Sequence, residues 1–242
     1  GVAHNQGKTL VVVFLRGGID GLNAVIPFKE RSYYSLRPSI AIPEPTSGEG
    51  RSLDLDGFFS FHPSLAPLHP LYQNGTLALI HAAGSPANTR SHFDAEDYME
   101  TGTPGIKSTP DGWLNRTLKG EMENGNPLRA VAMSTKLPRL LSGSVSALTL
   151  RDIRSFRLHN KRLAPVLTDL YQKSGDPLFR LQGENLFRSM ALIEKVGARV
   201  PVSNEAYPRG PFGRSLGEIA RLIKSGMNMK IAFTEMGGWD SH

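Results

Sequence analysis

Short apolar runs alternate along the chain with longer, more polar segments. Four runs predict strands buried on both faces of a parallel sheet: Thr9–Leu15, Leu77–Ile80, Ala130–Met133 and Lys230–Thr234. Thr9–Leu15 (TLVVVFL) is expected to be the first central strand. Because long segments separate the four runs, the connections between strands are expected to be crossovers and not hairpins.

Candidate helices lie between the strands. In Arg214–Ser225, apolar residues recur at spacings of three and four, which is typical of a helix with one buried face. The other candidates are Pro63–Tyr72, Phe93–Glu100, Gly112–Lys119, Ala164–Lys173 and Glu184–Val196. Alternation of strands and helices predicts an α/β fold, with a mostly parallel sheet flanked by helices. We interpret residues 1–242 as one such domain, with a charged helical insertion or cap over residues 150–211.

Composition excludes several classes of protein. Lys and Arg outnumber Asp and Glu by 28 to 22, and the excess is scattered, so a dedicated nucleic-acid surface is not expected. The longest apolar runs are far below the ~20 residues of a membrane-spanning helix. There are no cysteines, so any metal must bind to His, Asp or Glu. Nothing in the sequence indicates an oligomeric state.

Polar residues that directly follow a buried strand deserve scrutiny, because ligands of parallel sheets bind outside the carboxyl ends of the strands. The first strand is followed by GGIDGLN, in which Asp20 stands between glycines. Asp20 is a candidate metal ligand at the tip of the strand. The alternative is that Asp20 only caps the following turn or helix.

A second candidate follows Leu77–Ile80, where the sequence TRSHFD leads into a predicted helix. The hydroxyl of Ser91 would stand beside free backbone N–H groups, at the positive end of the helix dipole, where an anion is favoured. Ser91 is a candidate nucleophile, and Arg90 and His92 could hold or protonate a phosphate or sulfate. The alternative is that Ser91 is an N-cap, with Asp94 completing a variant of the capping box.

The third candidate is the segment TEMGGWDSH, directly after the last strand. Asp240 and His242, with Glu235 five residues before Asp240, supply oxygen and imidazole ligands that suit zinc or manganese. Because Asp20 and Asp240 must converge if they share a metal site, we expect the first and last strands to be parallel and to be neighbours or near-neighbours.

Five motifs together resemble the exported domain-of-unknown-function family numbered 1501, which is grouped with the alkaline phosphatase and sulfatase superfamily. They occur in the expected order and are distributed over nearly the whole chain: LVVVFLRGGIDGLN, HPSLAPLHPLY, RSHFDAEDYMETG, DGWLNR and GGWDSH. The resemblance implies an alkaline phosphatase-like fold. It also implies a bacterial, periplasmic location after export by a twin-arginine signal that this sequence does not contain.

Members of that superfamily use two metal ions and an activated nucleophile to hydrolyse phosphate or sulfate esters. The resemblance therefore implies bound zinc, manganese or calcium and a small anionic ester substrate. Matched by position, Asp20, Asp240 and His242 are implied metal ligands, and the spacing from Glu235 to Asp240 is also similar. Ser91 matches the nucleophile, and Arg90 would clamp the nonbridging oxygens of the substrate.

The superfamily's later motifs, an Asp-His pair and a final His, have no counterpart within these 242 residues. We therefore expect an incomplete domain that is inactive in this form, because half of a two-metal site binds metal weakly. The alternative is a non-catalytic binding or assembly module of the cell envelope, since fold does not imply function.

Overall fold

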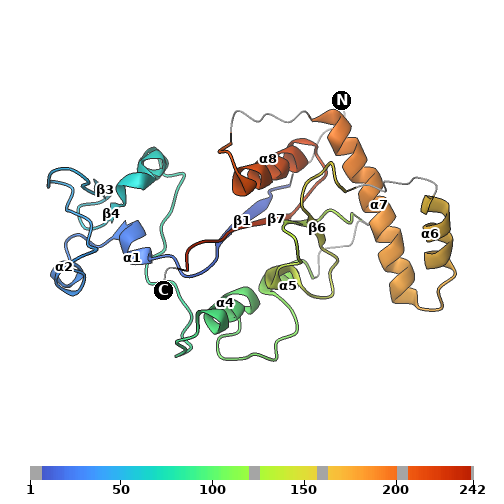
Figure 1. The fold of residues 1–242 in the computed structure, drawn as a ribbon, viewed down its shortest axis with the longest axis horizontal. Coiled ribbons are helices and arrows are strands. Elements are labelled where there is room, and N and C mark those ends of the chain that lie inside the picture. The colour runs from blue at the N-terminus through green and yellow to red at the C-terminus, as the bar shows by residue number, and fades with distance from the viewer. Residues whose placement is uncertain (1–6, 120–125, 157–162, 201–206, 241–242) are drawn as a thin grey trace. The chain divides into compact units, whose positions relative to one another are not determined.

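The computed structural model describes residues 7–119, 126–156, 163–200 and 207–240. The chain divides into two compact units (Figure 1). Unit 1 comprises residues 1–17 and 85–242, and unit 2 comprises residues 18–84. A four-stranded sheet lies in unit 1 and a three-stranded sheet in unit 2, so each unit is built on a sheet of its own.

The sheet of unit 1 has the strand order β1-β7-β5-β6, and every neighbouring pair is parallel. Its strands are β1 (Leu10–Leu15), β5 (Ala130–Met133), β6 (Leu148–Leu150) and β7 (Ile231–Met236). The predicted pairing of the first and last strands is confirmed, because β1 and β7 are parallel neighbours with Val12 opposite Phe233. The short strand β6 was not predicted.

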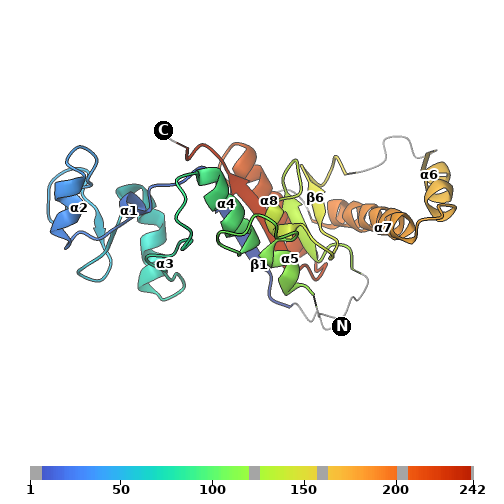
Figure 2. The same ribbon diagram turned by 90° about the horizontal axis from the view of Figure 1, so that it is seen from below.

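Helices cover both faces of this sheet. One face carries α4 (His92–Thr101), α5 (Trp113–Thr117) and the 3₁₀ turn η2 (Arg139–Leu141). The other face carries α7 (Pro177–Arg199) and α8 (Pro211–Lys224), and α6 (Leu163–Gln172) packs on α7. Figure 1 shows α4 and α5 on one side of β1 and β7 and α8 on the other, and Figure 2 shows these elements from the side of α4. The predicted α/β architecture with a parallel sheet flanked by helices is confirmed at this level.

Successive side chains of a central strand point to opposite faces of the sheet, which explains the two cores. In β5, Ala130 and Ala132 pack against the α5 face, whereas Val131 and Met133 pack against the α7 and α8 face. All four are buried, as expected for a strand covered on both faces. In α8, Leu222 is 1% exposed and faces the same core as Val131.

The prediction that Thr9–Leu15 forms a central strand is wrong in its position. Among the described residues β1 pairs only with β7 and stands at the end of the sheet, and Leu10 is 49% exposed. An unbroken run of Leu, Val and Phe reports strand propensity and apolar character. It does not report how many neighbouring strands the run will have.

The predicted strand Leu77–Ile80 is also wrong, because no strand is assigned to these residues, and Ile80 is 84% exposed. The run follows a turn in which the backbone N–H of Leu77 donates to the carbonyl of Leu71. A short apolar run becomes a strand only when another strand pairs with it, and within the described residues Leu77–Ile80 pairs with none.

Unit 2 is a small antiparallel arrangement that the sequence did not predict. Its strands, in the order β2-β4-β3, are β2 (Val25–Ile26), β3 (Leu53–Asp54) and β4 (Ser60–Phe61). Its helical elements are α1 (Gly21–Ala24), α2 (Arg31–Leu36), the 3₁₀ turn η1 (Pro63–Leu68) and α3 (His69–Gln73). A cluster of Ile26, Phe28 and Tyr33 forms its core.

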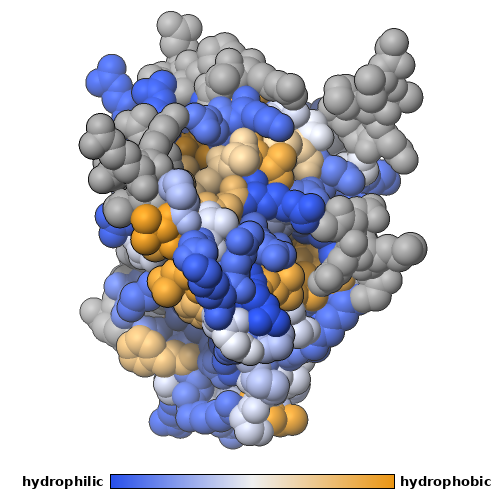
Figure 3. All heavy atoms as spheres, turned by 90° about the vertical axis from the view of Figure 1, so that its right-hand side faces the viewer, coloured by the Kyte–Doolittle hydropathy of each residue, from blue (hydrophilic) through white to orange (hydrophobic). Residues whose placement is uncertain are grey.

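Each of the six predicted helical segments contains a helix, although the first begins as η1 and continues as α3. Segment 150–211 contains α6 and α7, and its role as an insertion or cap stays a prediction. Several apolar side chains of α6 and α7 are exposed, among them Val166 and Leu178. Figure 3 shows hydrophobic patches between hydrophilic ones on this side of unit 1. Of the helices in the described residues, none is long and apolar enough to cross a membrane.

Candidate functional site

The carboxyl ends of β1 and β7 lie side by side, and the segments that leave them touch. Gly17 follows β1 with a φ of +117°. A Cβ atom added to Gly17 would lie 3.0 Å from the carbonyl carbon of Trp239, 2.9 Å from Cβ of Asp240 and closer still to the backbone nitrogen of Asp240. Only glycine accommodates both this φ and this approach. The segment that carries Asp240 is therefore packed onto the end of β1.

Ser91 is the N-cap of α4, as predicted for the start of this helix. Its Oγ accepts a hydrogen bond of 3.3 Å from the backbone N–H of Asp94. The start of α4 is the positive end of the helix dipole, where negative charge is favoured. The capping role of Ser91 is thus observed. It is compatible with a nucleophilic role, because both put the hydroxyl at the helix entrance.

The neighbour of Ser91 adds a positive charge to the same end of the helix. Arg90 is exposed, and within the described residues its guanidinium makes no ion pair or hydrogen bond. The nearby carboxylate of Asp94 is paired instead with Lys107, at 2.8 Å. An anion at the α4 N-terminus would therefore meet an arginine that no described carboxylate neutralises.

A histidine of α4 meets the segment after β7. The Nε2 atom of His92 lies 3.6 Å from Oδ2 of Asp240, with the imidazole 27% and the carboxylate 44% exposed. This separation is within ion-pair range but longer than a hydrogen bond. The imidazole ring also contacts the ring of Phe93, with centroids 4.0 Å apart. The structure therefore brings together His92, which immediately follows Ser91, and the predicted ligand Asp240.

One guanidinium joins α4 to the ends of β1 and β7. Arg16 is the residue after β1. It donates hydrogen bonds from Nη1 to Glu96, from Nη2 to Glu100 and from Nε to Glu235, and each donor–acceptor distance is 2.9 Å. We call these four residues the Arg16 cluster. Burial disfavours the charged form of Arg16, but hydrogen bonds to Glu100 and Glu235 outweigh burial and raise the pKa of Arg16 above its ordinary value.

The carboxylates that were expected to bind metal each contact a basic side chain of the chain itself. Glu235 is held by Arg16, Asp240 lies beside His92, and Asp20, in unit 2, is paired with Arg37. His242 lies outside the described residues. The described residues contain no group of three or more His, Asp or Glu side chains that could hold a metal ion. The expected metal centre therefore stays a prediction.

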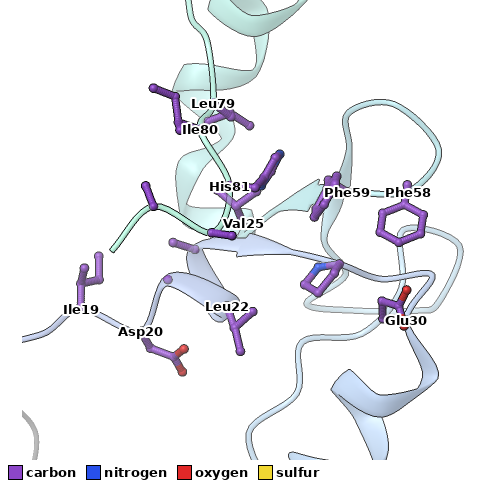
Figure 4. A pocket seen from close by; sticks show the side chains of 15 residues that line it. Ile19, Asp20, Leu22, Val25, Glu30, Phe58, Phe59, Leu79, Ile80 and His81 are labelled. Carbon is purple, nitrogen blue, oxygen red and sulfur yellow. The ribbon is translucent and has the colours of Figure 1, made fainter. Parts of the chain in front are cut away.

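Asp20 also lines a hollow of about 780 Å³ within unit 2. Figure 4 shows the rings of His81 and Phe59 face to face in its wall, and their centroids are 3.8 Å apart. Apart from Asp20, Glu30 and His81, the side chains of this wall are apolar. The hollow thus offers apolar surface and few polar groups, unlike the strand ends of unit 1.

No protein-family model, no curated protein and no solved structure matches this chain. The family resemblance that the motifs suggest therefore rests on those motifs alone.

Sequence reasoning did not find the Arg16 cluster. Two signals were available: Glu96 and Glu100 are spaced by four residues on one helix, and Arg16 directly follows a buried strand. The spacing places both carboxylates on the same helical face. Nothing in it identifies the cation, because Arg16 lies 80 and 84 residues away in the sequence from its partners on α4.

Proposed function

We propose that this protein hydrolyses small phosphate or sulfate esters, with Ser91 as the nucleophile, on an alkaline phosphatase-like fold. The observation that carries the proposal is the position of Ser91, which caps the ten-residue helix α4 where His92 meets Asp240. The positive end of the α4 dipole and the exposed Arg90 give the surroundings of this hydroxyl a positive potential, which suits an anionic ester. The family resemblance and the expected export of the protein belong to the same proposal.

In this mechanism the Ser91 oxygen attacks phosphorus or sulfur and the bond to the leaving oxygen breaks. The hydroxyl proton passes to the imidazole of His92, which Asp240 orients, and then to the departing alkoxide. Arg90 and the helix N–H groups bind the nonbridging oxygens. Water then cleaves the ester formed on Ser91 and regenerates the free hydroxyl.

Dependence on zinc, manganese or calcium is part of the proposal through the family resemblance. The proton transfers and contacts of this mechanism use groups of the chain itself, and the described carboxylates Glu235, Asp20 and Asp240 each contact a basic side chain. Assays with and without added metal test this dependence directly.

The test must separate the two roles of Ser91, capping and catalysis. Asn caps helices about as well as Ser but has no nucleophilic hydroxyl, whereas Ala has neither property. We expect Ser91→Ala and Ser91→Asn both to lose turnover of aryl phosphates or aryl sulfates. Only Ser91→Ala should also lose stability, by about 1 kcal/mol, as measured by urea unfolding.

Assays use the 242-residue chain and the longest form that the gene encodes, each with zinc, manganese, calcium or a chelator. We expect turnover to require added metal and a chain that supplies the further Asp and His ligands that the family resemblance implies. Retained turnover by Ser91→Asn would exclude Ser91 as the nucleophile. If no form hydrolyses any ester under any metal condition, the non-catalytic envelope module is the better interpretation.

A further inference from the structure

We propose that Arg16 is a positioning residue, which holds the N-terminus of α4, and with it Ser91, at the carboxyl ends of β1 and β7. The importance of this role for turnover rests on the proposed function. We call this restraint of α4 by Arg16 the clamp. It rests on the hydrogen bonds of the Arg16 cluster, so the clamp and its importance for turnover can be tested separately.

The clamp acts at two points of one rigid element. Glu96 and Glu100 are one turn apart on the same face of α4, about 6 Å along its axis. Both bind the guanidinium of Arg16, and their second oxygens accept backbone N–H groups of Gly17 at 2.8 Å and Leu140 at 3.0 Å. Two fixed points on a helix determine its axis and its rotation. The start of α4 is therefore set relative to the end of β1.

Burial makes these bonds more effective than surface ion pairs. The side chain of Glu100 is 5% exposed and that of Glu96 is 17% exposed. Charge-assisted hydrogen bonds in such surroundings are stronger and less screened than those at the surface. Without Arg16, three carboxylates would face one another with no cation between them, so α4 would move away from the strand ends.

Only arginine can make this clamp. Three different nitrogens of Arg16 serve three carboxylates on α4 and β7, through the planar geometry of the guanidinium. A lysine would keep the charge but would place one compact ammonium where a fork is needed. Arg16→Lys is therefore the informative substitution, because it changes position while it preserves charge.

The chain supplies a matched control at the other end of the same helix. Arg116 is 34% exposed, compared with 33% for Arg16, and its Nη2 atom donates to the carbonyl of Thr101, the last residue of α4. Arg116 also binds Asp111, at 2.9 Å. Arg116→Lys should therefore weaken the packing of α4 at its far end and leave the end that carries Ser91 in place.

The first measurement is amide hydrogen exchange by NMR on the 242-residue chain. In Arg16→Lys we expect exchange at Ala95 and Glu96 to quicken at least about tenfold, the effect of losing one charge-assisted hydrogen bond. Glu96→Gln, which keeps acceptor capacity on one atom, should show a smaller change in the same direction. Unchanged exchange at these amides in Arg16→Lys, or an equal increase in Arg116→Lys, would overturn the clamp.

The second measurement is the split between kcat and KM in the longest form that the gene encodes. Misplacement of a nucleophile by about 1 Å lowers the rate roughly 100-fold. We expect Arg16→Lys to lose about that much kcat with KM changed less than about threefold, and Arg116→Lys to keep kcat. Equal loss of kcat in both variants would mean general destabilisation and would overturn the positioning role. Absence of turnover in the wild type would defeat the proposed function, and hydrogen exchange would still decide the clamp.

Discussion

Replacement of Gly17 by alanine tests whether the segment after β7 is packed onto the end of β1. The added methyl group would meet the backbone of Trp239 and Asp240, with contacts of 2.9 Å to Asp240 Cβ and 3.0 Å to the Trp239 carbonyl carbon. Side-chain rotation cannot relieve such contacts, because backbone atoms make two of the three. The segment must move, and the approach of Asp240 to His92 must change with it.

Two terms contribute to the expected loss of stability. Holding a non-glycine residue at a φ of +117° costs about 1–2 kcal/mol. Forcing backbone atoms apart in a packed region costs about a further 1–3 kcal/mol. Gly17→Ala should therefore lower the free energy of unfolding by roughly 2–5 kcal/mol.

Gly18 offers a control for the first term alone. It has a φ of +87°, and no described atom would lie within 4 Å of a Cβ atom added there, so Gly18→Ala carries the backbone strain without the collision. Its expected cost is about 1–2 kcal/mol. The difference between the two variants isolates the packing of Asp240 against Gly17.

Urea unfolding monitored by circular dichroism and tryptophan fluorescence measures both free energies. The chain has two tryptophans, and one of them, Trp239, lies in the displaced segment, so its native-state emission should change in Gly17→Ala. Equal losses of stability in Gly17→Ala and Gly18→Ala, with unchanged emission, would refute the close approach of Asp240 to Gly17.

Two further predictions concern stability alone. Asn115 is fully buried, donates to the Val145 carbonyl at 2.7 Å and accepts from the Val145 N–H. Asn115→Ala should therefore lower the free energy of unfolding in urea by about 3 kcal/mol. A decrease below about 1 kcal/mol would contradict this role. Hydrogen bonds from the backbone N–H groups of Phe59 and Phe58 lower the pKa of Asp56. The ionised carboxylate therefore stabilises the fold above its ordinary pKa of about 4, and this stabilisation is lost as pH falls through the lowered pKa. The stability difference between wild type and Asp56→Asn should accordingly shrink below about pH 4, and a constant difference from pH 5 to pH 2 would show that Asp56 does not titrate in this way.

Much of the parallel sheet could be predicted from the sequence, because burial on two faces leaves a simple signature. Ala130–Met133 is a strand with the predicted bounds, and β7 begins one residue after the predicted start at Lys230. The apolar run Leu77–Ile80 has the same signature and forms no strand. An apolar run predicts an extended, buried segment, but pairing depends on a partner elsewhere in the chain, which the run itself does not identify.

The candidate site could be predicted only where the signal is local. The capping role of Ser91 follows from residues within one helical turn, and the structure shows it. The pairing of Arg16 with Glu235 joins residues 219 positions apart, and it depends on which strands become neighbours. Metal ligation was predicted from residue type and stays a prediction, whereas the contact of Asp20 with Arg37 could not be predicted from residue type.

The pairing of β1 with β7 has a consequence for the synthesis of the chain. These strands are separated by about 220 residues, so translation at 5–20 residues per second leaves LVVVFL without its partner for roughly 10–45 s. Closing a loop of that length costs about 5 kcal/mol of chain entropy before the first ladder bond forms. Six consecutive uncharged residues of high strand propensity are meanwhile a template for intermolecular β-aggregation. Nascent chains should therefore depend on a holding chaperone until Ile231–Met236 has emerged from the ribosome.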